Sequence, residues 1–72
     1  MQPEIEAAAG EILAYLDVHG DGPVMALRDA LGKPELNFWM GLGDLILRHQ
    51  VSLREREGVF WTLHGPQAAR AA

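Results

Sequence analysis

Two glycine–proline breaks divide the first fifty residues into three short segments. The run Gly20-Asp21-Gly22-Pro23 is a turn signal, and Gly32 followed by Pro34 marks a second break. Glycine readily adopts the left-handed conformation that ends a helix, whereas proline is well tolerated only in the first turn of one. The breaks therefore predict three helices joined by turns of a few residues.

The first helix is expected from Pro3 to His19, where apolar residues recur at helical spacing: Ile5, Ala9, Ile12 and Leu16. Val24-Met25 is predicted to form a brief edge strand. A short second helix then covers residues 27–31 and ends at Gly32. The third helix is expected from Pro34 to about His49, and it is the longest apolar segment in the chain.

Residues 51–63 are predicted to form a β-hairpin. Val51–Glu55 alternates apolar and polar residues, and Val59–Leu63 is rich in strand formers. A three-residue loop, Arg56-Glu57-Gly58, with the glycine in the left-handed conformation sets the register. The expected pairs are Val51 with Leu63, Ser52 with Thr62, Leu53 with Trp61, and Arg54 with Phe60.

A chain of 72 residues is expected to form one small domain, which we place at residues 1–64. Residues 65–72 offer no core residue, so they are predicted to be a disordered tail. The chain contains no cysteine, which excludes a disulfide framework and a thiolate zinc site. The expected core residues are Leu16, Leu31, Trp39, Leu42, Ile46, Leu53 and Trp61.

This order of elements is that of the winged helix-turn-helix. The stretch that carries the resemblance runs from Gly22-Pro23-Val24 through Leu27, Ala30, Leu31 and Gly32, and then from Leu42-Gly43 to Val51. More closely, residues 4–64 resemble a family of stand-alone bacterial winged-helix domains of unknown function. The resemblance implies a mainly α fold with a small β-hairpin (α+β), in which three helices precede a two- to three-stranded wing. It also implies a DNA-binding-type fold and a homodimer.

The net charge of −4 argues against binding to nucleic acid, because phosphate contacts normally require a basic face. The third helix offers only Asn37 and Arg48 to DNA, and its Asp44 would repel phosphate. On the hairpin, Arg54 and Arg56 could contact a phosphate, but Glu55 and Glu57 are adjacent in sequence and cancel their charge. A solvated hairpin of mixed charge is the favoured interpretation. Duplex DNA therefore remains the second choice of partner.

The third helix is apolar on nearly every side, and such a helix favours burial on more than one side. Its expected core face consists of Leu36, Trp39, Leu42, Gly43 and Ile46. We expect Phe38, Met40 and Leu47 to form an interface with a second copy or another protein, extended by Phe60. Reciprocal Asp44–Arg48 pairs would suit a two-fold axis. The alternative is a wide core stripe that leaves a few apolar residues exposed.

Other functions find no support in the sequence. No nucleophile–base pair, glycine-rich phosphate cradle or pair of carboxylates is evident, so we expect no enzyme, cofactor or small-molecule substrate. The histidines His19, His49 and His64 lack metal-ligand spacing. Neither a signal peptide nor a membrane-spanning run is expected, which predicts a cytoplasmic location. The preferred function is a non-catalytic regulatory module that acts by protein contact and self-association; the alternative is a sequence-specific DNA-binding regulator.

Overall fold

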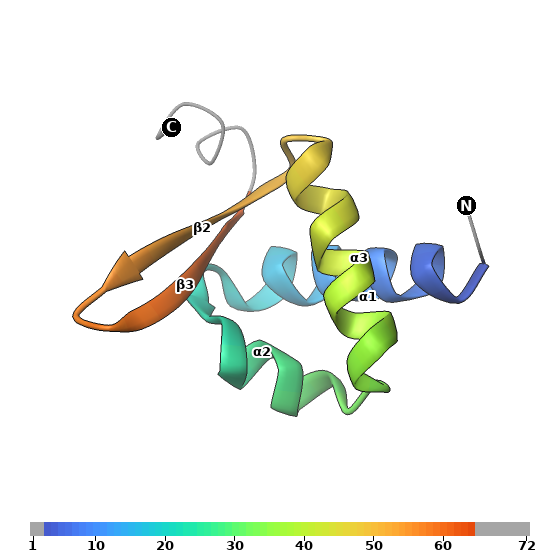
Figure 1. Cartoon of the computed structure of the whole chain (residues 1–72), viewed down its shortest axis with the longest axis horizontal. Helices are drawn as coiled ribbons and strands as arrows, with labels where there is room; N and C mark the ends of the chain where they lie inside the picture. The colour runs from blue at the N-terminus through green and yellow to red at the C-terminus, as the bar shows by residue number, and fades with distance from the viewer. Residues whose placement is uncertain (1–2, 65–72) are drawn as a thin grey trace.

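The computed structural model describes residues 3–64, which form three helices and a three-stranded antiparallel sheet (Figure 1). The elements are α1 (Pro3–His19), β1 (Gly22–Pro23), α2 (Val24–Leu31), α3 (Glu35–Leu47), β2 (Val51–Arg56) and β3 (Val59–His64). This confirms the α+β class, and the arrangement is compatible with a winged helix. The tail predicted at residues 65–72 lies outside the described residues. Within residues 3–64, no helix combines the length and the hydrophobicity needed to cross a bilayer.

Glycines end the first two helices, as predicted. Gly20 has a φ of 78°, and its N–H donates to the carbonyl oxygen of Leu16 at 2.8 Å. Gly32 has a φ of 59°, and its N–H donates to the carbonyl oxygen of Arg28 at 3.2 Å. Both residues occupy the left-handed region that a residue with a Cβ adopts at a cost. These two caps determine where the chain turns.

The edge strand predicted at Val24-Met25 is wrong, because those residues form the first turn of α2. The strand is Gly22–Pro23, which pairs with β3 at Thr62 and Trp61. Pro23 explains the boundary, since its φ of −60° and ψ of 137° are extended. Its missing N–H costs nothing at the edge of a sheet or before a helix. The third helix likewise ends at Leu47, two residues before the predicted end.

The hairpin differs from the prediction by one residue of register. The pairs are Val51 with His64, Ser52 with Leu63, Leu53 with Thr62, Arg54 with Trp61, Glu55 with Phe60, and Arg56 with Val59. The loop holds two residues, Glu57 and Gly58, whose φ values are 52° and 81°. Two consecutive left-handed residues make the turn whose twist matches that of the flanking strands. The left-handed conformation of Glu57, a residue with a Cβ, was not predicted from the sequence.

The observed register sorts the hairpin side chains into two faces, because neighbouring residues point to opposite sides of a strand. One face carries Val51 and Thr62 into the core and continues outward along Leu53 and Phe60. The opposite face carries Arg54, Arg56, Val59, Trp61 and Leu63. In Figure 1 the turn of the hairpin extends well beyond the helices. Leu53 and Phe60 are therefore the part of the inner face that the helices leave exposed.

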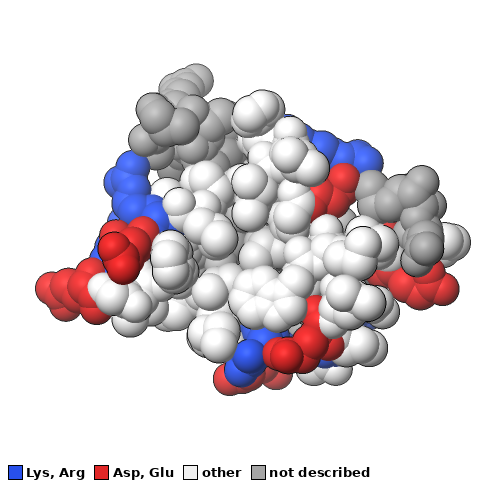
Figure 2. All heavy atoms as spheres, viewed as in Figure 1, with Lys and Arg blue, Asp and Glu red and all other residues white. Residues whose placement is uncertain are grey.

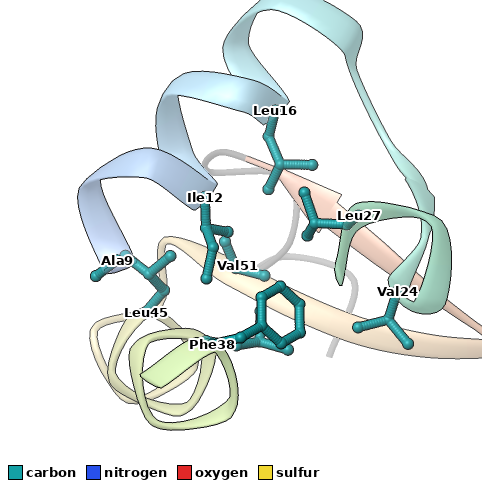
Figure 3. Close-up of a cluster of buried hydrophobic side chains, with 9 residues drawn as sticks. Ala9, Ile12, Leu16, Val24, Leu27, Phe38, Leu45 and Val51 are labelled. Atoms are coloured by element: carbon teal, nitrogen blue, oxygen red, sulfur yellow. The ribbon is translucent and has the colours of Figure 1, made fainter. Parts of the chain in front are cut away.

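The core draws on every helix and on β2. Figure 3 shows side chains of α1, α2, α3 and β2 that point toward one another. The core cluster consists of Ala9, Ile12, Leu16, Val24, Leu27, Phe38, Leu42, Leu45 and Val51. Of the predicted core residues, Leu16 and Leu42 are confirmed, and Leu31 and Ile46 pack against the cluster half-buried. Trp61 is half-buried, whereas Trp39 and Leu53 are exposed, so those two predictions are wrong.

Candidate protein-interaction surface

The inward side of α3 is determined by shape as well as by hydrophobicity. Its buried residues are Phe38, Gly41, Leu42 and Leu45, which recur at helical spacing. Phe38 is 0% exposed. A Cβ added at Gly41 would lie 2.9 Å from the backbone nitrogen of Ala9 and 3.0 Å from the Cβ of Ala8. Only glycine therefore allows α1 to approach α3 this closely.

The outward side of the same helix is apolar as well. Leu36, Trp39, Met40, Gly43 and Leu47 share this side, which we call the outer face of α3. Leu36 is 69% exposed, Leu47 is 80% exposed, and Trp39 and Met40 expose more than a third of their surface. In soluble proteins, contiguous apolar patches of this kind commonly mark interaction sites.

An open apolar hollow lies on the outer face. Its lining consists of Ile5, Met40, Gly43, Asp44, Ile46 and Leu47. A Cβ built on Gly43 would meet nothing within 4 Å, so the hollow stands open above the helix backbone. Met40 and Leu47 lie about one helical turn to either side of Gly43 on the same face. The hollow therefore sits between two projecting apolar side chains.

A second apolar hollow, which we call the wing groove, separates the hairpin from the helices. It is lined by Val24, Met25, Trp39, Leu53, Gly58, Val59 and Phe60. Trp39 belongs both to this groove and to the outer face of α3, and its ring meets that of Phe38 edge-on at 4.9 Å. Trp39 thus connects the exposed apolar residues of α3 with those of the wing.

Most charged side chains lie around this surface, and Asp44 is the one charged residue among the described residues that line the hollow beside Gly43. Figure 2 shows a broad uncharged area across the middle of one face, with acidic and basic residues gathered around its edge. Arg48 pairs with Asp44 at 3.1 Å, and Arg28 pairs with both Asp29 and Glu35. No lysine, arginine or histidine occurs between the first and the last residue of α3. The two acidic residues of α3, Glu35 and Asp44, are therefore each paired with an arginine of the same chain.

The structure redistributes the residues that the sequence assigned to an interface. Met40, Leu47 and Phe60 are exposed, as the interface interpretation requires, and Phe60 lies in the wing groove. The exposed position predicted for Phe38 is wrong, because its ring is in the core. Asp44 and Arg48 meet within one chain, one helical turn apart. Leu36 and Trp39 were predicted to lie on the core face, but the structure places both at the surface.

The residues considered for DNA contact do not form one basic surface. Asn37 is half-buried at the side of α3, and Arg48 follows the end of that helix. Arg54 and Arg56 lie near the hairpin turn, on the face away from Phe60. The guanidinium of Arg56 lies 5.1 Å from the centre of the Trp61 ring, a cation–π distance. The helix that would enter a DNA groove thus presents apolar side chains where base-reading groups belong.

Several residues of this surface were missed from the sequence, chiefly Gly43, Leu36, Trp39 and Ile5. One usable signal existed: a glycine within an apolar helix indicates either a close helix contact or an open surface. Among residues 3–64, no group of three or more histidine, aspartate or glutamate side chains could hold a metal ion together. No protein-family model, curated protein or solved structure matches this chain.

Proposed function

We propose that this chain is a non-catalytic regulatory module that acts by protein contact through the outer face of α3, and that its partner is a second copy of itself. The observation that carries the proposal is the composition of that face, which is apolar, exposed and free of basic residues. The resemblance to stand-alone bacterial winged-helix domains and the cytoplasmic location stay predictions.

The area of the molecule fits a dimer. A stable interface takes roughly 800 Å² from each partner, which is about a sixth of the 4603 Å² surface of this chain. Supplying that area requires a whole face of so small a domain. The uncharged middle of the face in Figure 2 offers one, and burial of apolar surface contributes about 25 cal/mol per Å². The outer face would form the centre of such an interface.

A second copy suits this surface better than a partner with a charge pattern of its own. The surface carries no unpaired acidic or basic group of α3 with which to select such a partner, because Asp44 is neutralised by Arg48. A two-fold dimer brings the same patch of both copies together. An uncharged patch is compatible with itself, whereas a patch of one charge sign would repel its copy.

DNA binding is the second candidate function, and the observation that favours it is the position of Arg54 and Arg56 on one face of the wing. Wing residues of this kind could contact backbone phosphates. The composition of α3 makes this candidate the weaker one, because this helix contributes no cation between Glu35 and Leu47. DNA contact by the wing alone would be non-specific and strongly dependent on salt.

The proposal predicts that Met40→Asp converts a dimer into a folded monomer. Sedimentation equilibrium from low to high micromolar concentration measures the association, and circular dichroism checks the fold. The matched control is Val18→Asp, which adds the same charge at a 77% exposed valine of α1 that does not line either hollow. The wild type and Val18→Asp should both dimerise. A wild type that stays monomeric at high micromolar concentration would contradict the proposal.

The same experiment with added duplex DNA separates the two candidates. Under the proposal, DNA leaves the sedimentation of the protein almost unchanged at physiological salt. Tight binding that is lost in an Arg54→Ala, Arg56→Ala double variant, but kept in Met40→Asp, would instead establish the DNA-binding function.

A further inference from the structure

Gly43 occupies the centre of the outer face of α3. It follows Met40 by three positions, precedes Leu47 by four and follows Leu36 by seven, so the four share one side of the helix. Glycine is the poorest helix former apart from proline. Among residues 3–64 nothing requires glycine here, because a Cβ at Gly43 would meet no atom within 4 Å. Gly10 of α1 is equally open, but half of the residues around it are charged or polar, whereas Gly43 lies between the exposed apolar side chains Met40 and Leu47.

The same helix shows what a glycine can do when a neighbour is present. At Gly41, two residues earlier, the missing Cβ admits the backbone of α1, whose Ala9 nitrogen would lie 2.9 Å from that Cβ. Gly43 points to the other side of α3, where bulky apolar side chains surround an open hollow. Each glycine therefore leaves the backbone of α3 uncovered on its own side of the helix. Only at Gly41 does another helix of the same chain fill that space.

We infer that Gly43 is the point at which the α3 helices of two copies cross. This inference rests on the proposed function and specifies how the second copy binds. With the two-fold axis beside Gly43, the glycine of each copy faces that of the other, and the helix backbones approach closely. Met40 and Leu47 of each copy then pack along the partner's helix, beside the hollow that the glycine leaves open. One surface supplies both the projections and the recess that two-fold contact requires.

The charges next to the crossing point are consistent with it. Asp44 directly follows Gly43, so a two-fold axis at Gly43 brings the Asp44 carboxylates of the two copies near each other. Like charges in such a position would oppose association. Each carboxylate is, however, held by Arg48 of its own chain at 3.1 Å, and only 18% of the Asp44 side chain is exposed. The crossing point is thus bordered by neutral ion pairs.

Gly43→Leu tests the crossing point, because the two available explanations predict opposite signs. If the outer face associated only through unspecific apolar contact, a leucine would enlarge it and strengthen the dimer. If two helices cross at Gly43, a leucine separates their backbones. Overpacking of this kind is expected to raise the dimer dissociation constant roughly 10- to 100-fold. Gly43→Ala should raise it less.

Ala14→Leu is the matched control, because it adds a leucine side chain to an exposed position of another helix. Ala14 is an exposed residue of α1 on the side away from the core, and it lines neither the hollow around Gly43 nor the wing groove. Its dimer dissociation constant should equal that of the wild type. Sedimentation equilibrium provides the constants, and thermal unfolding shows that each variant folds.

The outcomes separate the inference from the proposed function. A wild-type dimer that Met40→Asp dissociates, but that Gly43→Leu strengthens or leaves unchanged, overturns the crossing at Gly43 and leaves the self-association intact. A wild type that is monomeric throughout overturns both. Weakening by Gly43→Leu and not by Ala14→Leu supports the crossing.

Discussion

The two sides of α3 are both apolar, but one is buried in the core and the other is exposed. Phe38, Leu42 and Leu45 lie in the core, whereas Leu36, Met40 and Leu47 lie at the surface. Both sets follow helical spacing, so the hydrophobic pattern alone gives no reason to bury one set and not the other. The difference lies in shape: Gly41 fits against Ala8 and Ala9 of α1, while Gly43 has nothing to fit. Close packing selects the buried face where hydrophobicity does not.

Replacing one large apolar residue on each side tests this difference most strongly. Phe38→Ala should destabilise the domain by about 3–5 kcal/mol, because it leaves a cavity at a fully buried site. Leu36→Ala, at a mostly exposed site, should change stability by less than about 0.5 kcal/mol. Urea unfolding in a Met40→Asp background compares the two as monomers. Equal losses would mean that the outer face is covered within the monomer.

Alanine substitutions at Gly41 and Gly43 should change the stability of the monomer by smaller amounts and in opposite directions. Gly41→Ala should destabilise the monomer by about 1–3 kcal/mol, because the new methyl group overlaps the backbone of α1. Gly43→Ala should stabilise the same monomer by up to about 1 kcal/mol, through helix propensity alone. Urea unfolding in the Met40→Asp background again gives both values. Destabilisation by Gly43→Ala would show that this side of α3 packs against its own chain.

The sequence was sufficient to predict the order of the elements and the ends of the first two helices. Gly20 and Gly32 end their helices because few other residues adopt the left-handed conformation. The hairpin was located but misregistered, because Glu57 shares the left-handed conformation with Gly58 and shortens the loop to two residues. Sequence rules favour asparagine or glycine at that first position, so the glutamate concealed the turn.

The orientation of α3 could not be predicted, for a physical reason. The core side of α3 was predicted to lie opposite Asn37, Asp44 and Arg48, since polar residues usually occupy the middle of an exposed face. In the structure Asn37 and Asp44 are half-buried and lie at the border between the buried and exposed sides. The prediction is therefore rotated by about a quarter of a turn, which exchanges Phe38 with Leu36 and Trp39. Met40 and Leu47 fall on the exposed side in both orientations, so they alone of this helix's large apolar residues were placed correctly at the surface.

On the inner face of the hairpin, an apolar residue is exposed and a polar residue is buried. At its exposed end lies the apolar Phe60, whereas at its buried end lies Thr62, which is 0% exposed. Within the described part of the chain, the Thr62 hydroxyl has no hydrogen-bond partner. A buried hydroxyl without a partner lowers stability because it has lost its water.

Thr62→Val should therefore stabilise the domain by about 1 kcal/mol, since valine has nearly the same shape and no hydroxyl to desolvate. The reverse change at the neighbouring buried position, Val51→Thr, should destabilise the domain by a similar amount, because it introduces the same unmet hydroxyl. Urea unfolding of both variants in the Met40→Asp background measures the pair. If Thr62→Val instead destabilises the domain, the Thr62 hydroxyl forms a hydrogen bond, for example to a buried water, and this bond contributes to stability. Opposite signs at the two positions would show that the core between the hairpin and the helices excludes a hydroxyl without a hydrogen-bond partner.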